Sequence, residues 1–180
     1  MTEKVLKDSI REEKIRQCLR NWFIKKGKMV LIREKALREM KYSEGRSTPD
    51  IVAYKRRANT VYLVECKKAS KLRHVGHAFG QMLADKLSLT RMRRKDLQKK
   101  LQQLTGKSDL NTLKLSFGVA FPKQHVDRKE IGRMITMMRR EEPFKNLAIY
   151  VVDTVNTNVS NSVIKKSKGK LVNYTELMKS

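Results

Sequence analysis

This chain is poor in cysteine, in aromatic residues and in acidic residues for its length. Its two cysteines, in a chain of 180 residues, do not make a disulfide framework, and both fall in segments that we expect to be buried, Cys18 in a helix and Cys66 in a strand. Aromatic residues make up 6%, which disfavours a surface that stacks the bases of single-stranded RNA. No apolar run approaches the roughly 18 residues of a membrane span, and the first residues lack the apolar core of a signal peptide. We therefore expect a cytoplasmic protein in a reducing environment.

The shortage of acidic residues leaves a large positive charge. Eighteen Asp and Glu stand against 42 Lys and Arg, which gives a net charge of +24. Charge of this size favours a polyanion as partner, so we expect DNA and a nucleoid-associated location. A membrane surface is disfavoured, because no strongly apolar face opposes a basic one. The alternative is a solvated basic exterior without a partner.

Hydrophobic periodicity predicts one α/β domain. We expect helices at 4–26, 75–92 and 126–140, strands at 29–33, 113–121 and 147–152, and a hairpin between the first strand and the second helix. Residues 34–48 fit either a strand or a helix. Strands followed by alternating helices and strands predict an α/β sandwich with a central mixed sheet. The domain should span residues 1–155, and 156–180 should form a basic C-terminal extension packed on it or trailing from it.

The hairpin brings two carboxylates together. Two apolar runs, 51–54 and 60–64, flank a short polar connection. If the loop is centred between Arg57 and Ala58, Asp50 lies directly opposite Glu65, where side chains of an antiparallel pair are about 5 Å apart. Alternation along the strand then places Lys67 on the face of Glu65 and turns Cys66 away.

Two opposed carboxylates repel each other, so something should compensate for them. A divalent cation is the simplest candidate, because hard cations such as Mg²⁺ prefer carboxylate oxygens and retain several waters. In the alternative interpretation, Asp50 merely starts a strand after a proline, and Glu65 pairs with Lys67.

Pro49-Asp50 followed by Glu65-Cys66-Lys67 resembles the signature of the PD-(D/E)xK nucleases, with the two acids 15 positions apart. The stretch 76–81 resembles the helix that carries a glutamine, here Gln81, in the RecB-like and archaeal Holliday-junction-resolvase-like branches. In RecB-like members a tyrosine often follows that glutamine by four residues, and here the position is Asp85.

The resemblance implies a restriction-endonuclease-like fold and metal-dependent hydrolysis of DNA phosphodiester bonds. Asp50, Glu65 and the backbone carbonyl of Cys66 would bind Mg²⁺, for which Mn²⁺ would substitute. Lys67 would orient a water or stabilise developing charge. Gln81 would contact the phosphate, the water or that lysine.

The resembling family often takes a further acid from an N-terminal helix, and Glu12 is the candidate here. At about 100° per residue, Glu12 falls within about 20° of Leu19 on the apolar stripe, whereas Glu13 is about 120° away. Glu12 would complete the metal shell or hold a second metal. Alternatively, it lies at the rim of the core and pairs with Arg16, four residues on.

Two basic segments follow the hairpin, and either could be a solvated face or a surface for DNA. Candidate phosphate contacts are Lys68, Lys71 and Arg73 in the first, and Arg91, Arg93 and Arg94 in the second. His74 and His77 are three residues apart, but no further ligand nearby completes a zinc site.

Two alternative functions stay open: a non-catalytic DNA-binding module on the same fold, and a ribonuclease or RNA-binding protein. Symmetric cutting by so small a chain would require a homodimer.

Overall fold

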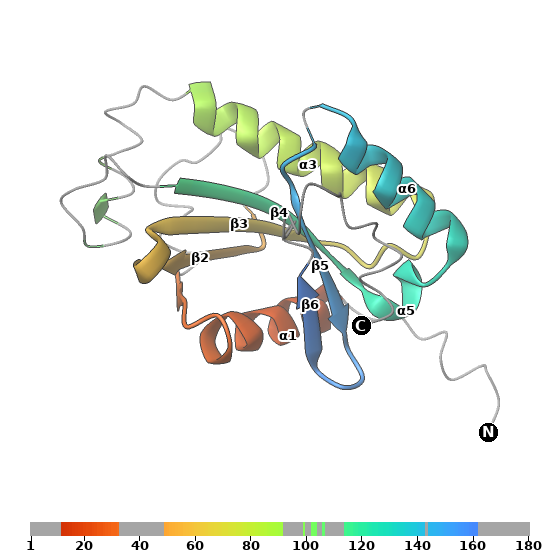
Figure 1. The fold of residues 1–180 in the computed structure, drawn as a ribbon, viewed down its shortest axis with the longest axis horizontal. Coiled ribbons are helices and arrows are strands. Elements are labelled where there is room, and N and C mark those ends of the chain that lie inside the picture. The colour runs from red at the N-terminus through yellow and green to blue at the C-terminus, as the bar shows by residue number, and fades with distance from the viewer. Residues whose placement is uncertain are drawn as a thin grey trace, which may run out of the picture.

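The computed structural model describes residues 12–32, 49–91, 99, 102–103, 106, 114–142 and 144–161. In these segments the chain forms α1 (Glu12–Lys25), β1 (Val30–Leu31), β2 (Ile51–Lys55), the 3-10 turn η2 (Arg56–Ala58), β3 (Thr60–Cys66), α3 (Leu72–Arg91), β4 (Lys114–Pro122), α5 (Lys123–Val126), α6 (Lys129–Arg140), β5 (Ala148–Asp153) and β6 (Asn158–Asn161). The expected mixed α/β class is confirmed (Figure 1).

The six strands form one mixed sheet in sequence order, β1-β2-β3-β4-β5-β6. β1, β2 and β3 are antiparallel neighbours, β3, β4 and β5 are parallel, and β6 returns antiparallel to β5. The predicted hairpin register is confirmed, because Val52 pairs with Leu63 and Tyr54 with Val61. One step beyond the last pair, Ile51 with Val64, Asp50 comes opposite Glu65.

Helices cover both faces of the sheet, as Figure 1 shows, with α1 on one side and α3 and α6 on the other. β3 has neighbours on both edges and is buried along nearly its whole length, which explains its almost continuous apolar sequence. Its side chains alternate between the two cores. Leu63 packs in the core under α3 and α6, whereas Val64 and Cys66 pack in the core under α1. Glu65 therefore starts from the α3 side of the sheet.

Some predicted boundaries were wrong. The expected helix at 126–140 is two helices, because the chain turns at Asp127 and Arg128 between α5 and α6. The first residues of the expected C-terminal extension form β6, which completes the sheet, while 162–180 lie outside the described residues. Residues 34–48, which fit either a strand or a helix, and residues 4–11 of the predicted first helix also lie outside them. Among the described helices, none has the length and apolar character needed to cross a membrane.

Two glycines provide a matched test of packing. A Cβ on Gly118 in β4 would lie 2.8 Å from Cε2 of Tyr150 and 3.0 Å from the carbonyl oxygen of Ala148. Gly80 is exposed in the middle of α3, and a Cβ there would meet nothing within 4 Å. We expect Gly118→Ala to lower the free energy of unfolding by about 1 to 3 kcal/mol through overpacking. Gly80→Ala should raise it by about 0.5 to 1 kcal/mol through lower chain entropy. Urea unfolding of both variants measures the difference, and equal effects would contradict this packing.

Candidate active site

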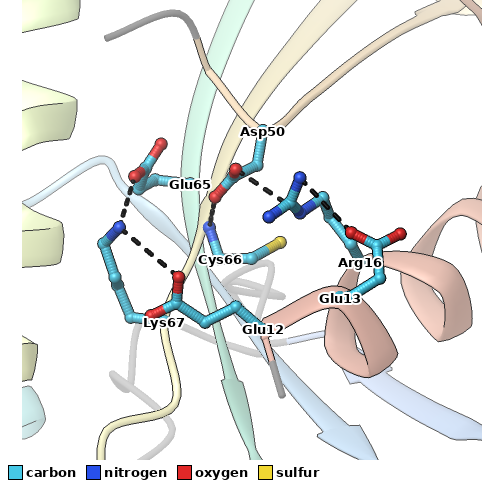
Figure 2. A network of polar contacts seen from close by, with 7 residues as sticks. All are labelled: Glu12, Glu13, Arg16, Asp50, Glu65, Cys66 and Lys67. Carbon is cyan, nitrogen blue, oxygen red and sulfur yellow. Dashed lines mark hydrogen bonds and ion pairs between the residues drawn. The ribbon is translucent and has the colours of Figure 1, made fainter.

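Asp50 sits at the bend that leads into β2, and both of its carboxylate oxygens are engaged. Oδ2 accepts a hydrogen bond from the backbone N–H of Cys66 at 2.8 Å. Oδ1 lies 3.5 Å from Nε of Arg16, which comes from α1 (Figure 2). The hairpin, through Cys66, and α1, through Arg16, thus hold this carboxylate between them.

Glu65, Lys67 and Glu12 form the second half of the network. Nζ of Lys67 lies 3.0 Å from Oε1 of Glu65 and 3.9 Å from Oε2 of Glu12. The Glu65 side chain is only 3% exposed, while that of Glu12 is 34% exposed. Figure 2 shows the ammonium group between the two carboxylates. The structure therefore brings together the predicted residues Glu12, Glu65 and Lys67, with Asp50 opposite Glu65.

The helical phase of α1 separates its two glutamates as predicted. Glu12 reaches Lys67, while Glu13 is 62% exposed and pairs with Nη1 of Arg16 at 3.4 Å. The alternative in which Glu12 pairs with Arg16 does not describe the observed contacts, because Arg16 lies between Glu13 and Asp50. Glu12 thus faces the site and not a partner on its own helix.

Burial dominates the electrostatics of the carboxylates. Burial, followed by the negative charge of Asp50, raises the pKa of Glu65 to about 7. Burial also raises the pKa of Asp50, although the Cys66 N–H and the Arg16 guanidinium oppose the rise. Burial alone would lower the pKa of Lys67, but the hydrogen bond to Glu65 and the surrounding carboxylates outweigh that effect and raise it. Lys67 thus holds its charge while Glu65 changes protonation near neutral pH.

The remaining predicted site residues are placed less directly. The Cys66 thiol is fully buried on the α1 side, where burial raises its pKa, so the residue serves the site through its backbone. Gln81 lies in the middle of α3, with its Oε1 atom buried. Its contact with the phosphate, the water or Lys67 stays a prediction.

The predicted basic contacts divide into two groups. Lys71 and Arg73 are exposed and Lys68 is half-buried, all at or near the start of α3, directly after the site. Arg91 ends α3, about 30 Å from that start for a helix of 20 residues. Arg93 and Arg94 lie outside the described residues.

Arg16, His125 and Arg128 are site neighbours that sequence reasoning did not identify. Helical spacing indicates Arg16 only as a partner of Glu12 within α1. The ring of His125 in α5 is hydrogen-bonded to the carbonyl oxygen of Lys68, and Nη1 of Arg128 donates to that of Ser70 at 3.4 Å. These contacts join residues more than 50 positions apart, so spacing along the chain carries no signal for them.

The donor set fits one hard cation that keeps much of its water. Within the part of the chain that the structure describes, no group of three or more His, Cys, Asp or Glu side chains could hold a metal ion. Two opposed carboxylates remain, and one of them, Glu65, is almost fully buried with its pKa near neutrality. Mg²⁺ suits such a site, because it uses one or two protein carboxylates and fills its remaining positions with waters and phosphate oxygens.

The raised pKa of Glu65 predicts a pH-dependent cost in metal-free protein. A carboxyl group whose pKa rises on folding, here from 4.5 to about 7, stabilises the folded state below pH 4.5 and loses that contribution as pH rises through 7. At pH 8 the loss is about 3 kcal/mol. Glu65→Gln mimics the protonated form, so in EDTA it should be more stable than the parent at pH 8 and nearly equal at pH 4. Urea unfolding measures both, and Glu13→Gln is the exposed control. If the free energies of unfolding of the parent and of Glu65→Gln change with pH in the same way, the raised pKa of Glu65 is contradicted.

Comparisons with protein-family models, with curated proteins and with solved structures find no match for this chain. The interpretation of the site therefore depends on its own geometry and on the motif resemblance.

Proposed function

We propose that this protein is a metal-dependent endonuclease that hydrolyses phosphodiester bonds in DNA. The observation that carries the proposal is the opposition of Asp50 and Glu65 at the end of a buried hairpin, with the Lys67 ammonium between Glu65 and Glu12. The residues of the Asp, Glu-x-Lys pattern, which resembles the PD-(D/E)xK signature, thus lie together in space. The mixed sheet with helices on both faces is compatible with the restriction-endonuclease-like fold that the resemblance implies.

Each residue has a role that follows from its contacts. Asp50 and Glu65, with the Cys66 carbonyl, would hold Mg²⁺ or Mn²⁺, which when bound polarises a phosphate oxygen and lowers the pKa of a water. Arg16 and the Cys66 N–H fix the orientation of the Asp50 carboxylate. The Lys67 ammonium, charged throughout the physiological range, would orient the attacking water or stabilise negative charge on the phosphate.

Glu12 would act through Lys67 or at the edge of the metal shell. Its carboxylate is 3.9 Å from the ammonium and one third exposed, so a water or a substrate group could come between them. The positive charge of the whole chain would draw a polyanion toward this acidic site.

Cleavage assays distinguish the proposed DNA endonuclease from a non-catalytic DNA-binding module and from a ribonuclease. The protein should cut DNA from a panel of linear, nicked, flapped and four-way substrates with Mg²⁺ or Mn²⁺, and should not cut in EDTA. Asp50→Asn and Glu65→Gln should abolish cutting yet still bind DNA, because they keep the shape of the site and remove its anionic ligands. Gel assays of cutting and anisotropy of binding measure the two properties separately. Binding without cutting under every condition would favour the non-catalytic module, and cutting of RNA alone would favour the ribonuclease.

The two adjacent lysines distinguish chemistry from general charge. Lys67→Met should lose about 10² to 10⁴ in single-turnover rate, the range for positioned proton-transfer and charge-stabilising groups. Lys68→Met removes the same charge one residue later, yet Lys68 makes no ion pair among the described residues, so its loss should be much smaller. Circular dichroism of both variants checks that they are folded. Equal losses would show that Lys67 contributes only its charge and not its position.

A further inference from the structure

Two turns that are far apart in the sequence meet beside the candidate site. The β3–α3 turn, residues 67–71, follows β3, and the α5–α6 turn, residues 127–128, follows α5 at the end of β4. β3 and β4 are parallel neighbours, so their carboxyl ends lie at the same edge of the sheet. Contacts from His125 and Arg128 to the carbonyl oxygens of Lys68 and Ser70 hold the two turns together.

Four basic side chains gather where the turns meet, and we call them the basic surface: Lys68, Lys71, Arg73 and Arg128. The last three are exposed, and within the described part of the chain none of the four is in an ion pair with a carboxylate. Residues 123–130 contain three basic residues, including Arg128, and two acidic ones, so this segment as a whole carries a net charge of +1.

His74 marks the border between the basic surface and the carboxylates. Its pKa is lowered most by burial, next by the positive charges of Lys68 and Arg73, and least by that of Lys71. The negative charge of Glu12 acts in the opposite direction on the same ring. One imidazole, hydrogen-bonded to Ser70 Oγ at 3.2 Å, thus lies within the fields of both the basic surface and the site.

The opposite border of the site, formed by α1, differs in charge. Glu13 is exposed there, and the guanidinium of Arg16 is already engaged by Glu13 and Asp50. The first turn of α1 thus presents two carboxylates and one exposed cation, Lys14, to a polyanion, whereas the two turns and the start of α3 present three exposed cations and one exposed carboxylate, Asp127.

We propose that the sugar–phosphate backbone of DNA reaches the carboxylates across the basic surface and not across α1, an inference that rests on the proposed function. The α5–α6 turn then belongs to the DNA interface, and Arg128 is a phosphate contact supplied from outside the hairpin and its helix. Phosphate contacts position the substrate and read no sequence.

Two triple variants with the same change in net charge test the path. Lys71→Ala/Arg73→Ala/Arg128→Ala removes three members of the basic surface. The control Lys25→Ala/Lys26→Ala/Arg140→Ala removes three exposed cations at the far ends of α1 and α6. The probe is a fluorescein-labelled DNA duplex of about 20 base pairs, titrated in EDTA at several salt concentrations from roughly 50 to 200 mM.

The first triple should flatten the slope of log K against log salt by up to about 2.7, since each phosphate contact contributes about 0.9. The control triple should leave the slope nearly unchanged. Equal slopes for the two variants would overturn the proposed path. Cutting is measured separately with Mg²⁺. If the slopes differ as expected but DNA is not cut, the basic surface is supported and the proposed nuclease activity is contradicted. If DNA is cut but the slopes are equal, the nuclease activity is supported and the proposed path is contradicted.

A measurement on the unaltered protein avoids any effect of substitution on folding. DNA phosphates on Lys68, Lys71 and Arg73 would compensate the charges that lower the pKa of His74, so this pKa should rise when the duplex binds. NMR titration of the imidazole measures it, with His77, exposed one turn further along α3, as the internal control. If the pKa of His74 is the same in the complex saturated with DNA as in the free protein, the DNA binds elsewhere.

Discussion

The structure of the site depends on two carboxylates that face each other at the end of a buried hairpin. Strand pairing puts Asp50 opposite Glu65, and Glu65 is too deeply buried for water to screen the repulsion. The two negative charges are compensated differently. Asp50 accepts a hydrogen bond from a backbone N–H and pairs with a guanidinium, while Glu65 pairs with an ammonium and keeps a raised pKa. The remaining carboxylate charge is what the proposed cation would neutralise.

Packing supplies the precision that these polar contacts lack by themselves. Ion pairs with part of their surface in water contribute little to stability, and buried ones scarcely repay their lost hydration. The apolar stripe of α1, which includes Ile15, Leu19 and Phe23, packs on Ile51 and Val64 of the hairpin. That contact fixes the start of α1 near the hairpin's end, so its polar residues reach the site. The core beneath α3 fixes the other border in the same way.

Local chemistry was readable from the sequence, and contacts between distant segments were not. A polar connection between two apolar runs determines a hairpin register, and the phase of a helix determines which of Glu12 and Glu13 faces inward; both predictions are confirmed. The apolar stripe of the predicted helix at 126–140 lies wholly within α6, so periodicity did not define where that helix begins, and the turn at Asp127 and Arg128 was missed. The contact from Arg128 to Ser70 depends on how two crossovers pack on the same face of the sheet, which no spacing along one segment encodes.

The composition and the site are two sides of one electrostatic problem. A catalyst that holds a hard cation for a reaction on a polyanion uses carboxylates at the reacting centre, and those carboxylates repel the substrate. Here four of the 18 acidic residues, Glu12, Glu13, Asp50 and Glu65, gather at one place, in a chain whose basic residues exceed its acidic ones by 24. At ionic strengths near those of cells, charges beyond about 8 Å are largely screened. Distant lysines can therefore raise the rate of encounter, but only cations beside the site can hold a phosphate against its carboxylates. A basic border directly after Lys67 is thus a requirement of the proposed chemistry and not merely a consequence of a basic composition.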